Sequence, residues 1–474
     1  MNQALIQYLQ QQMRTLPDRL RRFTHSTSSE LYPQRLMFEQ ISQYINDFLE
    51  KKSSNKMIII PGFRGVGKTT LMAQLCEKYQ STAHSTLFLS IEDAKNILDA
   101  GIIDVMAAYE EIIGNQLENI KEPTLFFLDE IQSDPKWAIT LKSLFEKTTH
   151  IFFCCSGSSA VTLQTTPNLA RRAIFEKLPP LCFTEYEMIK NNIHPPEELR
   201  NKIFQTIYFS KDANEVFNKL LKLQSTVHTY WIKVNRFDIK KFLSYGTLPF
   251  ALTMPNETVV YDSIALLLDK IIKSDLPTLG NFNADTLNAV KRILFAITEN
   301  DVASLNTLEK NLHINRLTIA SVFDAMEKAE LLIKIPAYGS NMTAAKKSNK
   351  YLFMSPAIRM SFFYFTGIEN TYSVREGKLL EDLVGSHLYR EFILKSQGAI
   401  RYDSAQGGAD FILQILNNKQ MIIEVGIGNK GKDQIVHSTK KIYSDYNLIF
   451  SNSRLAKDQE TNTVFVPLDF FLLM

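Results

Sequence analysis

Residues 62–69 read Gly62-Phe63-Arg64-Gly65-Val66-Gly67-Lys68-Thr69 and match G-x-x-x-x-G-K-[ST], the pattern of a phosphate-binding P-loop. The apolar run 57–60 before the loop predicts a buried strand, and the segment 71–75 after it predicts a helix. A strand that enters a glycine loop and a helix that leaves it direct backbone N–H groups and the positive helix end at phosphate oxygens. This stretch therefore predicts an α/β fold that binds a nucleotide.

The residue types within the loop have separate predicted roles. Lys68 would reach the β- and γ-phosphates of ATP, and Thr69 would ligate Mg²⁺ through its hydroxyl group. Gly65 and Gly67 would allow the backbone to approach the phosphates closely. The predicted nucleotide-contacting residues of the loop are Gly62, Arg64, Gly65, Val66, Gly67, Lys68, Thr69 and Thr70.

A second motif follows the apolar run 125–128, which ends in the carboxylates Asp129 and Glu130. This is the Walker B pattern, in which Asp129 would hold Mg²⁺ and Glu130 would polarise the attacking water. A chain that only bound a nucleotide would not need Glu130, so the pair predicts ATP hydrolysis. The alternative is a solvated acidic turn after a buried strand.

Further apolar runs at 86–91, 150–156 and 173–178 alternate with helical patterns at 102–119 and 136–147. Strands that alternate with helices predict parallel βαβ units and a sheet covered on both faces. Ligands of such sheets bind at the carboxyl ends of the strands. Ser156, at the end of the fourth run, would therefore lie near the γ-phosphate as a sensor residue, or would cap the strand end.

Four segments in order resemble one family: 62–70 as GFRGVGKTT, Asp129-Glu130-Ile131-Gln132 followed by Trp137, Ser156-Gly157-Ser158-Ser159, and 178–186 as LPPLCFTEY. They resemble the prokaryotic AAA+ ATPases of the AAA_14 plus DUF4143 type, over about residues 35–190. The resemblance implies an AAA+ core, and an arginine finger at Arg171 or Arg172 that acts on a neighbouring subunit's nucleotide. The alternative for both arginines is a surface charge.

The region after this core is rich in helical patterns and predicts a helical lid over 185–280. Pro249, in the turn 245–252, looks like a residue that contacts the nucleotide base, or it belongs to an ordinary turn between helices. Residues 281–368 predict a winged helix, with Lys346-Lys347-Ser348-Asn349-Lys350 as the wing tip. The wing lysines suit DNA, whereas the acidic candidate recognition helix 318–329 does not.

The last segment, 369–474, carries three carboxylates in a nuclease-like order. Glu381 on a helix, Asp410 before a strand and Glu424 on the next strand occupy the metal-binding positions of PD-(D/E)XK nucleases, and the segment looks like the DUF4143 domain. The position of the catalytic lysine holds Gly426. Lys430 or Lys432 would have to replace that lysine, and Gln434 could supplement the site. We therefore expect a degenerate domain with a binding or scaffolding role.

Composition agrees with a globular protein of several domains. The chain has 474 residues, 45% of them hydrophobic and 22% charged, and a net charge of +3, so any basic surface must be local. Four cysteines, at 76, 154, 155 and 182, have no metal-binding spacing and predict buried thiols in a reducing cytoplasm. Neither a signal peptide nor a transmembrane segment is expected. The predicted domains are 1–55 (helices and linker), 56–184 (ATPase core), 185–280, 281–368 and 369–474.

Together these patterns predict a cytoplasmic, Mg²⁺-dependent AAA+ ATPase that couples its nucleotide state to a nuclease-like C-terminal domain. A DNA-linked or defence-related process is the context that the resemblance implies. The alternative is a nucleotide-gated switch or scaffold that controls oligomerisation or a protein partner, with little turnover and no nuclease activity. Double-stranded DNA, a protein partner and further copies of the chain all remain possible partners.

Overall fold

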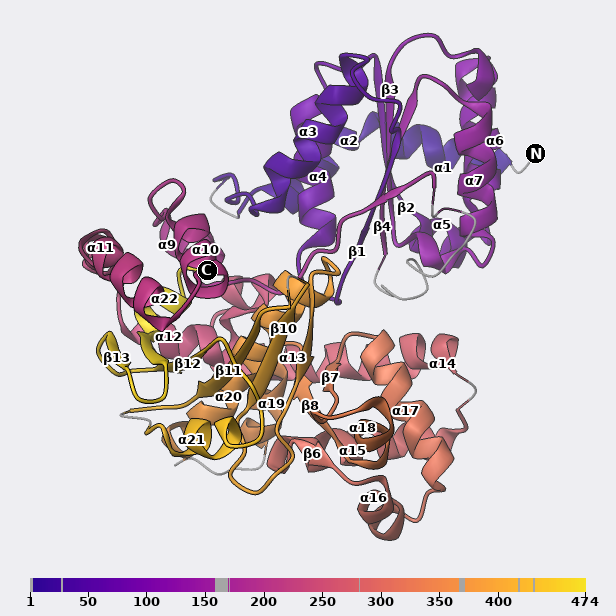
Figure 1. Cartoon of the computed structure of the whole chain (residues 1–474). Coiled ribbons are helices and arrows are strands. Elements are labelled where there is room, and N and C mark those ends of the chain that lie inside the picture. The colour runs from indigo at the N-terminus through magenta and orange to yellow at the C-terminus, as the bar shows by residue number, and fades with distance from the viewer. Residues whose placement is uncertain are drawn as a thin grey trace. The chain divides into compact units, whose positions relative to one another are not determined.

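The computed structural model describes residues 3–26, 29–157, 169, 171–280, 282–365, 371–416, 418–428 and 431–474. The chain divides into two compact units, residues 1–179 and 180–474, each of which has its own sheets and helices (Figure 1). None of the described helices combines the length and the apolar character that a membrane crossing requires.

The first unit is built on a five-stranded parallel sheet with the strand order β2-β3-β4-β1-β5, as the alternation of strands and helices predicted. The P-loop strand β1 lies between β4 and β5, and the Walker B strand β3 lies on the other side of β4. The strands are β1 (Met57–Pro61), β2 (Ser85–Ser90), β3 (Thr124–Asp129), β4 (Ile151–Gly157) and β5 (Ile174–Phe175).

Helices cover both faces of this sheet, with α3 and α4 on one side and α1, α6 and α7 on the other (Figure 1). Every residue of β1, β3 and β4 is buried, as expected for parallel strands between two helical layers. The helices of this unit are α1 (Gln3–Arg14), α2 (Leu16–Thr24), α3 (Met37–Leu49), α4 (Lys68–Tyr79), α5 (Ile91–Leu98), α6 (Ile102–Ile113), η1 (Leu117–Asn119), η2 (Ile131–Ser133) and α7 (Trp137–Lys147).

The second unit begins with helices, which the sequence predicted for 185–280. They pack in one hydrophobic core with the C-terminal sheet, since Phe183 and Trp231 belong to the same buried cluster as Tyr446 and Phe471. The helices are α9 (Phe183–Asn191), α10 (Leu199–Phe209), α11 (Ala213–Trp231), α12 (Phe237–Lys241), η3 (Phe242–Gly246), η4 (Pro249–Thr253), α13 (Glu257–Lys270), η5 (Ile271–Asp275) and α14 (Leu276–Leu279).

The middle of this unit has the elements, in order, that the sequence predicted for 281–368. Five helices of its described residues accompany a three-stranded antiparallel sheet with the order β6-β8-β7. Lys350 lies inside strand β8 and is buried, so its prediction as part of an exposed wing tip is wrong. The elements are α15 (Ala284–Glu299), β6 (Val302–Ala303), α16 (Leu305–Leu312), α17 (Arg316–Lys328), β7 (Leu332–Ile335), α18 (Asn341–Lys346), β8 (Asn349–Phe353) and α19 (Pro356–Phe365).

The C-terminal part forms a six-stranded mixed sheet with the order β13-β14-β12-β11-β10-β9. Strands β11, β12 and β14 run parallel, while β9, β10 and β13 pair antiparallel with their neighbours. The elements are α20 (Thr371–Leu388), η6 (Tyr389–Ile393), β9 (Gly398–Arg401), β10 (Phe411–Ile415), β11 (Gln420–Val425), α21 (Asp433–Thr439), β12 (Tyr446–Ser451), β13 (Ala456–Asp458), β14 (Thr463–Pro467) and α22 (Leu468–Phe471).

Backbone hydrogen bonds join the two sheets of the second unit. The Tyr338 N–H donates to the Tyr402 carbonyl over 2.8 Å, and the Tyr402 N–H donates to the Pro336 carbonyl over 3.1 Å. The Tyr402 hydroxyl also donates to the Ser348 carbonyl over 2.6 Å. Hydrogen bonds to backbone groups therefore link the two segments that were predicted as separate domains, 281–368 and 369–474.

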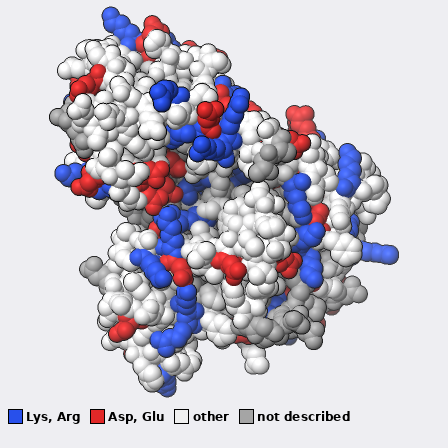
Figure 2. All heavy atoms as spheres, turned by 180° about the vertical axis from the view of Figure 1, so that it is seen from behind, with Lys and Arg blue, Asp and Glu red and all other residues white. Residues whose placement is uncertain are grey.

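Charged side chains of both signs are interspersed on the face that Figure 2 shows, with uncharged surface between them. This pattern agrees with the small net charge of +3. The four cysteines are free and buried, as predicted.

Candidate nucleotide site and a second carboxylate cluster

The P-loop connects the end of β1 at Pro61 to the start of α4 at Lys68. Gly65 has φ 82° and Gly67 has φ 91°, both in the left-handed region that favours glycine. Gly67 caps the N-terminus of α4, where the first backbone N–H groups have no partner within the helix. The loop therefore has the strand–turn–helix context that phosphate binding requires.

Lys68 points back into the loop. Its side chain is buried, and its ammonium donates to the carbonyls of Gly62, over 2.8 Å, and Phe63, over 3.1 Å. These carbonyls hold the charge inside the loop, where it attracts an anion.

The P-loop also contacts Leu178 and Arg35. A Cβ atom at Gly62 would lie 2.4 Å from the carbonyl oxygen of Leu178, so this glycine is required by packing against the backbone that follows β5. Arg35 donates to the carbonyls of Val66, over 2.6 Å, and Pro179, over 2.9 Å. Sequence reasoning missed Arg35, because no motif marks it and its partners lie far along the chain.

Asp129, at the end of β3, is the centre of the polar contacts. The Thr69 hydroxyl donates to its Oδ2 over 2.6 Å, the Ser156 hydroxyl donates to its Oδ1, and the Glu130 N–H lies 3.2 Å from the same Oδ1. Burial raises the pKa of Asp129, and the nearby Glu130 charge raises this pKa further. A cation at this carboxylate would oppose both effects, so the donor set of Thr69 and Asp129 fits Mg²⁺.

The carboxylate of Glu130 is held by two side chains. The Gln132 amide donates to Oε2, and Arg64 forms an ion pair with Oε1 at 3.9 Å. Glu130 has φ 53°, a left-handed conformation that is uncommon for glutamate. Such strain at a strand end is frequent at functional sites.

The two candidate arginines of the finger lie shortly before β5 in the chain. Arg172 forms an ion pair with Glu146 of α7 at 2.6 Å, whereas Arg171 is exposed. Ser158 and Ser159 lie outside the described residues. Pro249 begins η4 in the second unit, where it is half-buried, and its contact with a nucleotide base stays a prediction.

Two family models match the chain: an "AAA domain" at residues 54–187 and a "Domain of unknown function (DUF8612)" at residues 236–371. The uncharacterized protein MJ1637 of Methanocaldococcus jannaschii is 31% identical over 443 residues, which are 93% of this chain and 88% of that protein. The chain belongs to the MJ1637 family. The AAA domain that the resemblance implied lies mostly in the first unit, while the second family match is to DUF8612 rather than to DUF4143.

Solved structures with a similar arrangement include the RuvB Holliday junction branch migration motor of Thermotoga maritima and AMPPCP-bound DnaA of Aquifex aeolicus. The RuvB chain is 15% identical with a TM-score of 0.27, and the similarity covers 63% of this chain and 89% of that chain. The DnaA chain is 15% identical with a TM-score of 0.25, and the similarity covers 62% and 89%. The assignment of this MJ1637-family chain to the AAA class depends on the family match and not on these scores.

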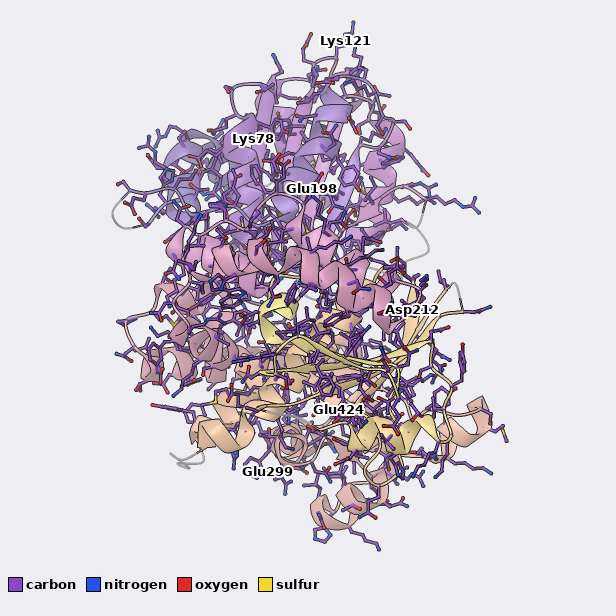
Figure 3. The ribbon with its side chains drawn as sticks, turned by 60° about the vertical axis from the view of Figure 1, so that its left-hand side comes forward. Lys78, Lys121, Glu198, Asp212, Glu299 and Glu424 are labelled. Atoms are coloured by element: carbon purple, nitrogen blue, oxygen red, sulfur yellow. The ribbon has the colours of Figure 1, made fainter. Side chains whose placement is uncertain are left out.

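The three predicted carboxylates of the C-terminal part lie close to one another in this MJ1637-family protein. Asp410 directly precedes β10, Glu424 lies on β11, and Glu381 lies on α20. The Asp410 N–H donates to the Glu424 carboxylate over 3.3 Å, and the Val425 N–H donates to Asp410 Oδ2 over 3.0 Å. Figure 3 shows Glu424 among the strands of the C-terminal sheet.

A cation that the sequence did not reveal lies in this cluster. The Lys350 ammonium forms an ion pair with Glu381 and another with Asp410 Oδ1 at 3.5 Å. The lysine considered for this role, Lys432, instead pairs with Asp458 and Glu460 at 3.0 and 3.1 Å, and Lys430 lies outside the described residues. Gln434 bonds to the Gly408 carbonyl.

No group of three or more His, Cys, Asp or Glu side chains could hold a metal ion in the part of the chain that the structure describes. Glu381, Asp410 and Glu424 therefore do not form a metal centre as they stand. The site of Thr69 and Asp129 differs, because one of its protein ligands is a hydroxyl group and nucleotide phosphates supply others.

Proposed function

We propose that this protein binds ATP with Mg²⁺ and hydrolyses it. The observation that carries the proposal is the position of Asp129, which joins the P-loop through Thr69 and the neighbouring strand β4 through Ser156. Thr69 and Asp129 would hold the Mg²⁺ ion, which neutralises phosphate charge when it is bound. Lys68 would bind the β- and γ-phosphates.

Glu130 is the proposed general base. Gln132 and Arg64 orient its carboxylate from the protein side, and its position directly after Asp129 puts it beside the metal ligand. Ser156 is the proposed sensor residue, although its hydroxyl contacts Asp129 directly, so it would respond to the metal as much as to the phosphate.

The proposed arginine finger is Arg171. Arg172 has an acidic partner within its own subunit, Glu146, whereas Arg171 is exposed, as a side chain that acts on a second copy must be. An arginine from a neighbour would stabilise charge on the transferred phosphoryl group. This proposal implies a homo-oligomer.

The second unit would carry the output of the ATPase. Its order of Glu381 on a helix, Asp410 before a strand and Glu424 on the next strand supports a nuclease-like fold. Gly426 in place of the catalytic lysine supports a binding or scaffolding role without cleavage, in a DNA-linked or defence process. The position of Lys350 favours the scaffold further, because its charge already balances the carboxylates.

The test is ATP turnover by wild type, Lys68→Ala and Glu130→Gln, with and without double-stranded DNA. Lys121→Ala and Glu122→Gln are the matched controls, since both residues are exposed in the same unit. We expect Lys68→Ala to lose ATP binding, and Glu130→Gln to keep binding while turnover falls by about 10²–10⁴. The controls should resemble wild type.

Absence of turnover in wild type under every condition would contradict hydrolysis and leave a nucleotide-gated scaffold. A large stimulation by DNA would support the DNA-linked role. Nucleotide-dependent assembly that DNA does not affect would support the switch.

A further inference from the structure

Lys350 is a buried cation whose backbone belongs to strand β8. Its residue pairs with Val302 of β6 on one side and with Ile335 of β7 on the other, so β8 is the central strand of its sheet. The side chain is 8% exposed, and its ammonium lies 5.2 Å from the centroid of the Phe411 ring. A long, flexible side chain is thus fixed at both its backbone and its charged end.

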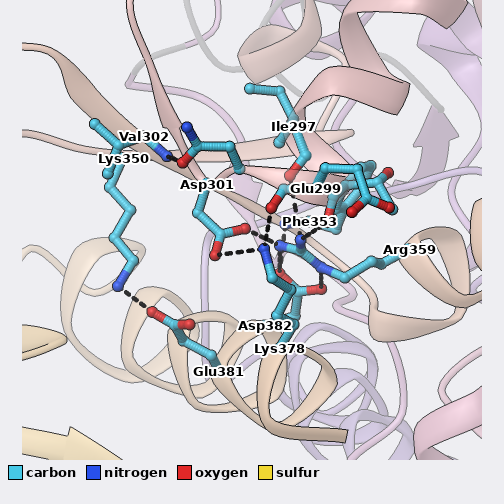
Figure 4. Close-up of polar contacts among 12 residues, drawn as sticks. Ile297, Glu299, Asp301, Val302, Lys350, Phe353, Arg359, Lys378, Glu381 and Asp382 are labelled. Atoms are coloured by element: carbon cyan, nitrogen blue, oxygen red, sulfur yellow. Dashed lines mark hydrogen bonds and ion pairs between the residues drawn. The ribbon is translucent and has the colours of Figure 1, made fainter. Parts of the chain in front are cut away.

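The acidic partners come from two further elements. Glu381 on α20 forms the shorter ion pair, shown in Figure 4, and Asp410 accepts at both its carboxylate (3.5 Å) and its backbone carbonyl (3.4 Å). Asp410 is in turn bonded to β11 through Val425 and Glu424. The Lys350 ammonium therefore lies between helix α20, which carries Glu381, and the start of strand β10, which Asp410 directly precedes.

The surrounding cations have other acidic partners. Arg359 pairs with Asp382 at 2.6 Å and with Asp301 at 2.7 Å, as Figure 4 shows. Lys378 pairs with Asp301 at 3.6 Å. Lys350 is thus the cation that forms ion pairs with both Glu381 and Asp410. Both neighbouring carboxylates raise the pKa of Lys350, so its ammonium stays charged despite burial.

We propose that Lys350 is the resident cation of the Glu381–Asp410–Glu424 cluster. Its ammonium takes the position between Glu381 and Asp410 that a divalent cation would otherwise fill, and it thereby closes the cluster to metal ions in the folded protein. The cluster then serves as a metal-free joint between β8 and the C-terminal sheet. Removal of the charge should uncover a site for a hard divalent cation, because the oxygen ligands remain in place.

The experiment is a titration of the nucleotide-free protein with Mn²⁺, in which electron paramagnetic resonance counts the unbound ion. The variants are Lys350→Met, which removes the charge at similar length, and the double variant Lys350→Met with Asp410→Asn. Lys347→Met is the matched control, since this lysine of the same segment is exposed and its ammonium donates to the Ser404 hydroxyl over 2.7 Å.

We expect Lys350→Met to bind one Mn²⁺ more than wild type, and the double variant to lose that ion. Lys347→Met should match wild type. Two results would overturn the proposal: an unchanged Mn²⁺ count in folded Lys350→Met, or a Mn²⁺ ion in wild type that Asp410→Asn removes.

Wild-type protein gives an independent test should Lys350→Met fail to fold. Reductive methylation followed by mass spectrometry reports which lysines are accessible. Lys350 should resist methylation in native protein both without and with excess Mn²⁺, while Lys347 reacts. If Mn²⁺ made Lys350 reactive, the metal would be displacing the ammonium, and a closed cluster would be excluded.

Discussion

His387, on α20, is a buried histidine enclosed by aromatic rings. It stacks on Tyr208 with ring centroids 5.8 Å apart, and it meets Phe471 edge-on at 5.2 Å. Burial, which is the largest cause, and the adjacent Arg390 charge together lower the pKa of His387 from 6.5 to about 3. Arg200 and Lys395 act in the same direction, while Glu391 opposes them. His387 is therefore neutral wherever the protein is folded near neutral pH.

This neutral state predicts a dependence of stability on pH. An unfolded histidine takes up a proton near pH 6.5, whereas folded His387 does so only near pH 3, so the unfolded state binds more protons in between. The contribution of His387 is complete above pH 6.5 and falls as the pH decreases towards 3, by at most about 1.4 kcal/mol per pH unit.

Urea unfolding of wild type and His387→Gln between pH 4 and 7 would measure this contribution as the difference between their unfolding free energies. The pH dependence of that difference should correspond to the uptake of about one proton at most. Glutamine keeps an acceptor for Arg390, which lies 3.3 Å from His387 Nδ1. Parallel curves for the two proteins over this range would show that His387 does not titrate as described.

Arg171 and Arg172 give a second prediction for single residues. Because Arg172 is held by Glu146 and Arg171 is exposed, Arg171→Ala should lower ATP turnover much more than Arg172→Ala. Arginine fingers are worth about 10³–10⁵ in turnover, which sets the scale of the loss. A mixture with Glu130→Gln would recover activity if Arg171 acts on a neighbour's site. Equal and small losses in both variants would exclude a finger at this position.

The placement of single residues on the fold was predictable where a local motif defines it. The loop of Lys68 and Thr69 and the pair Asp129-Glu130 are short patterns whose strand and helix context can be read nearby. Arg35 and Lys350 were not predictable, because their function depends on partners such as Pro179 and Asp410, which only the tertiary fold brings close.

At the scale of elements, the approach of β1 to the segment after β5 depends on Gly62. Because the obstacle to a side chain here is the backbone carbonyl of Leu178, at 2.4 Å from the Cβ position, it cannot rotate away. Gly62→Ala should destabilise the first unit by about 1–3 kcal/mol and weaken ATP binding.

Thermal unfolding and nucleotide titration would measure both effects. Gly377→Ala is the control, because its Cβ would meet only Ile427 at an ordinary 3.8 Å. Normal stability of Gly62→Ala would show that β1 and the segment 176–179 can separate without cost.

The buried strands of the AAA domain were predictable, since their uniformly apolar runs have few other interpretations. The π-helical turns η3 and η5 and the helix α18 were not. Their backbone geometry depends on packing against other segments: Gly246 of η3, for example, lies so close to Tyr186 that a Cβ atom would be 2.6 Å from the ring.

At the scale of the whole molecule, Arg359 connects three helices of the second unit. This fully buried side chain binds Asp382 through two nitrogens, at 2.6 and 2.8 Å, and it donates to the carbonyls of Ile297 (3.2 Å) and Thr298 (3.0 Å). It thereby joins α15 and α19 to α20. Removal of one partner from a buried pair leaves an uncompensated charge, which typically costs about 3–5 kcal/mol.

Asp382→Asn should lower the stability of the second unit by up to about this amount, because Asp301 remains as an acidic partner of Arg359, and segments 284–353 and 398–467 should unfold together. Urea unfolding gives the magnitude, and hydrogen exchange shows whether both segments lose protection at once. Asp433→Asn, at an exposed helix start, is the control. Loss of protection in α16 and α17 alone would mean that the two segments are independent.

The domain boundaries were the least predictable feature. Sequence patterns separate 185–280, 281–368 and 369–474, yet residues 180–474 form one compact unit with a shared hydrophobic core. A pattern reports which face of an element is apolar but not which element covers it. The backbone bonds between Tyr402 and residues 336–338 join two of these predicted segments inside that unit.

The position of Lys350 has a practical consequence for exchanging parts between relatives. A C-terminal segment cut at residue 369 would carry Glu381, Asp410 and Glu424 but not the ammonium that balances them. Chimeras should therefore be joined upstream of α15, and a substitution at position 350 would demand a compensating change at Glu381 on α20 or at Asp410 before β10. Substitutions of Lys350 and of the three carboxylates would have to occur together. The cluster therefore restricts how the sequence of this unit can diverge among relatives.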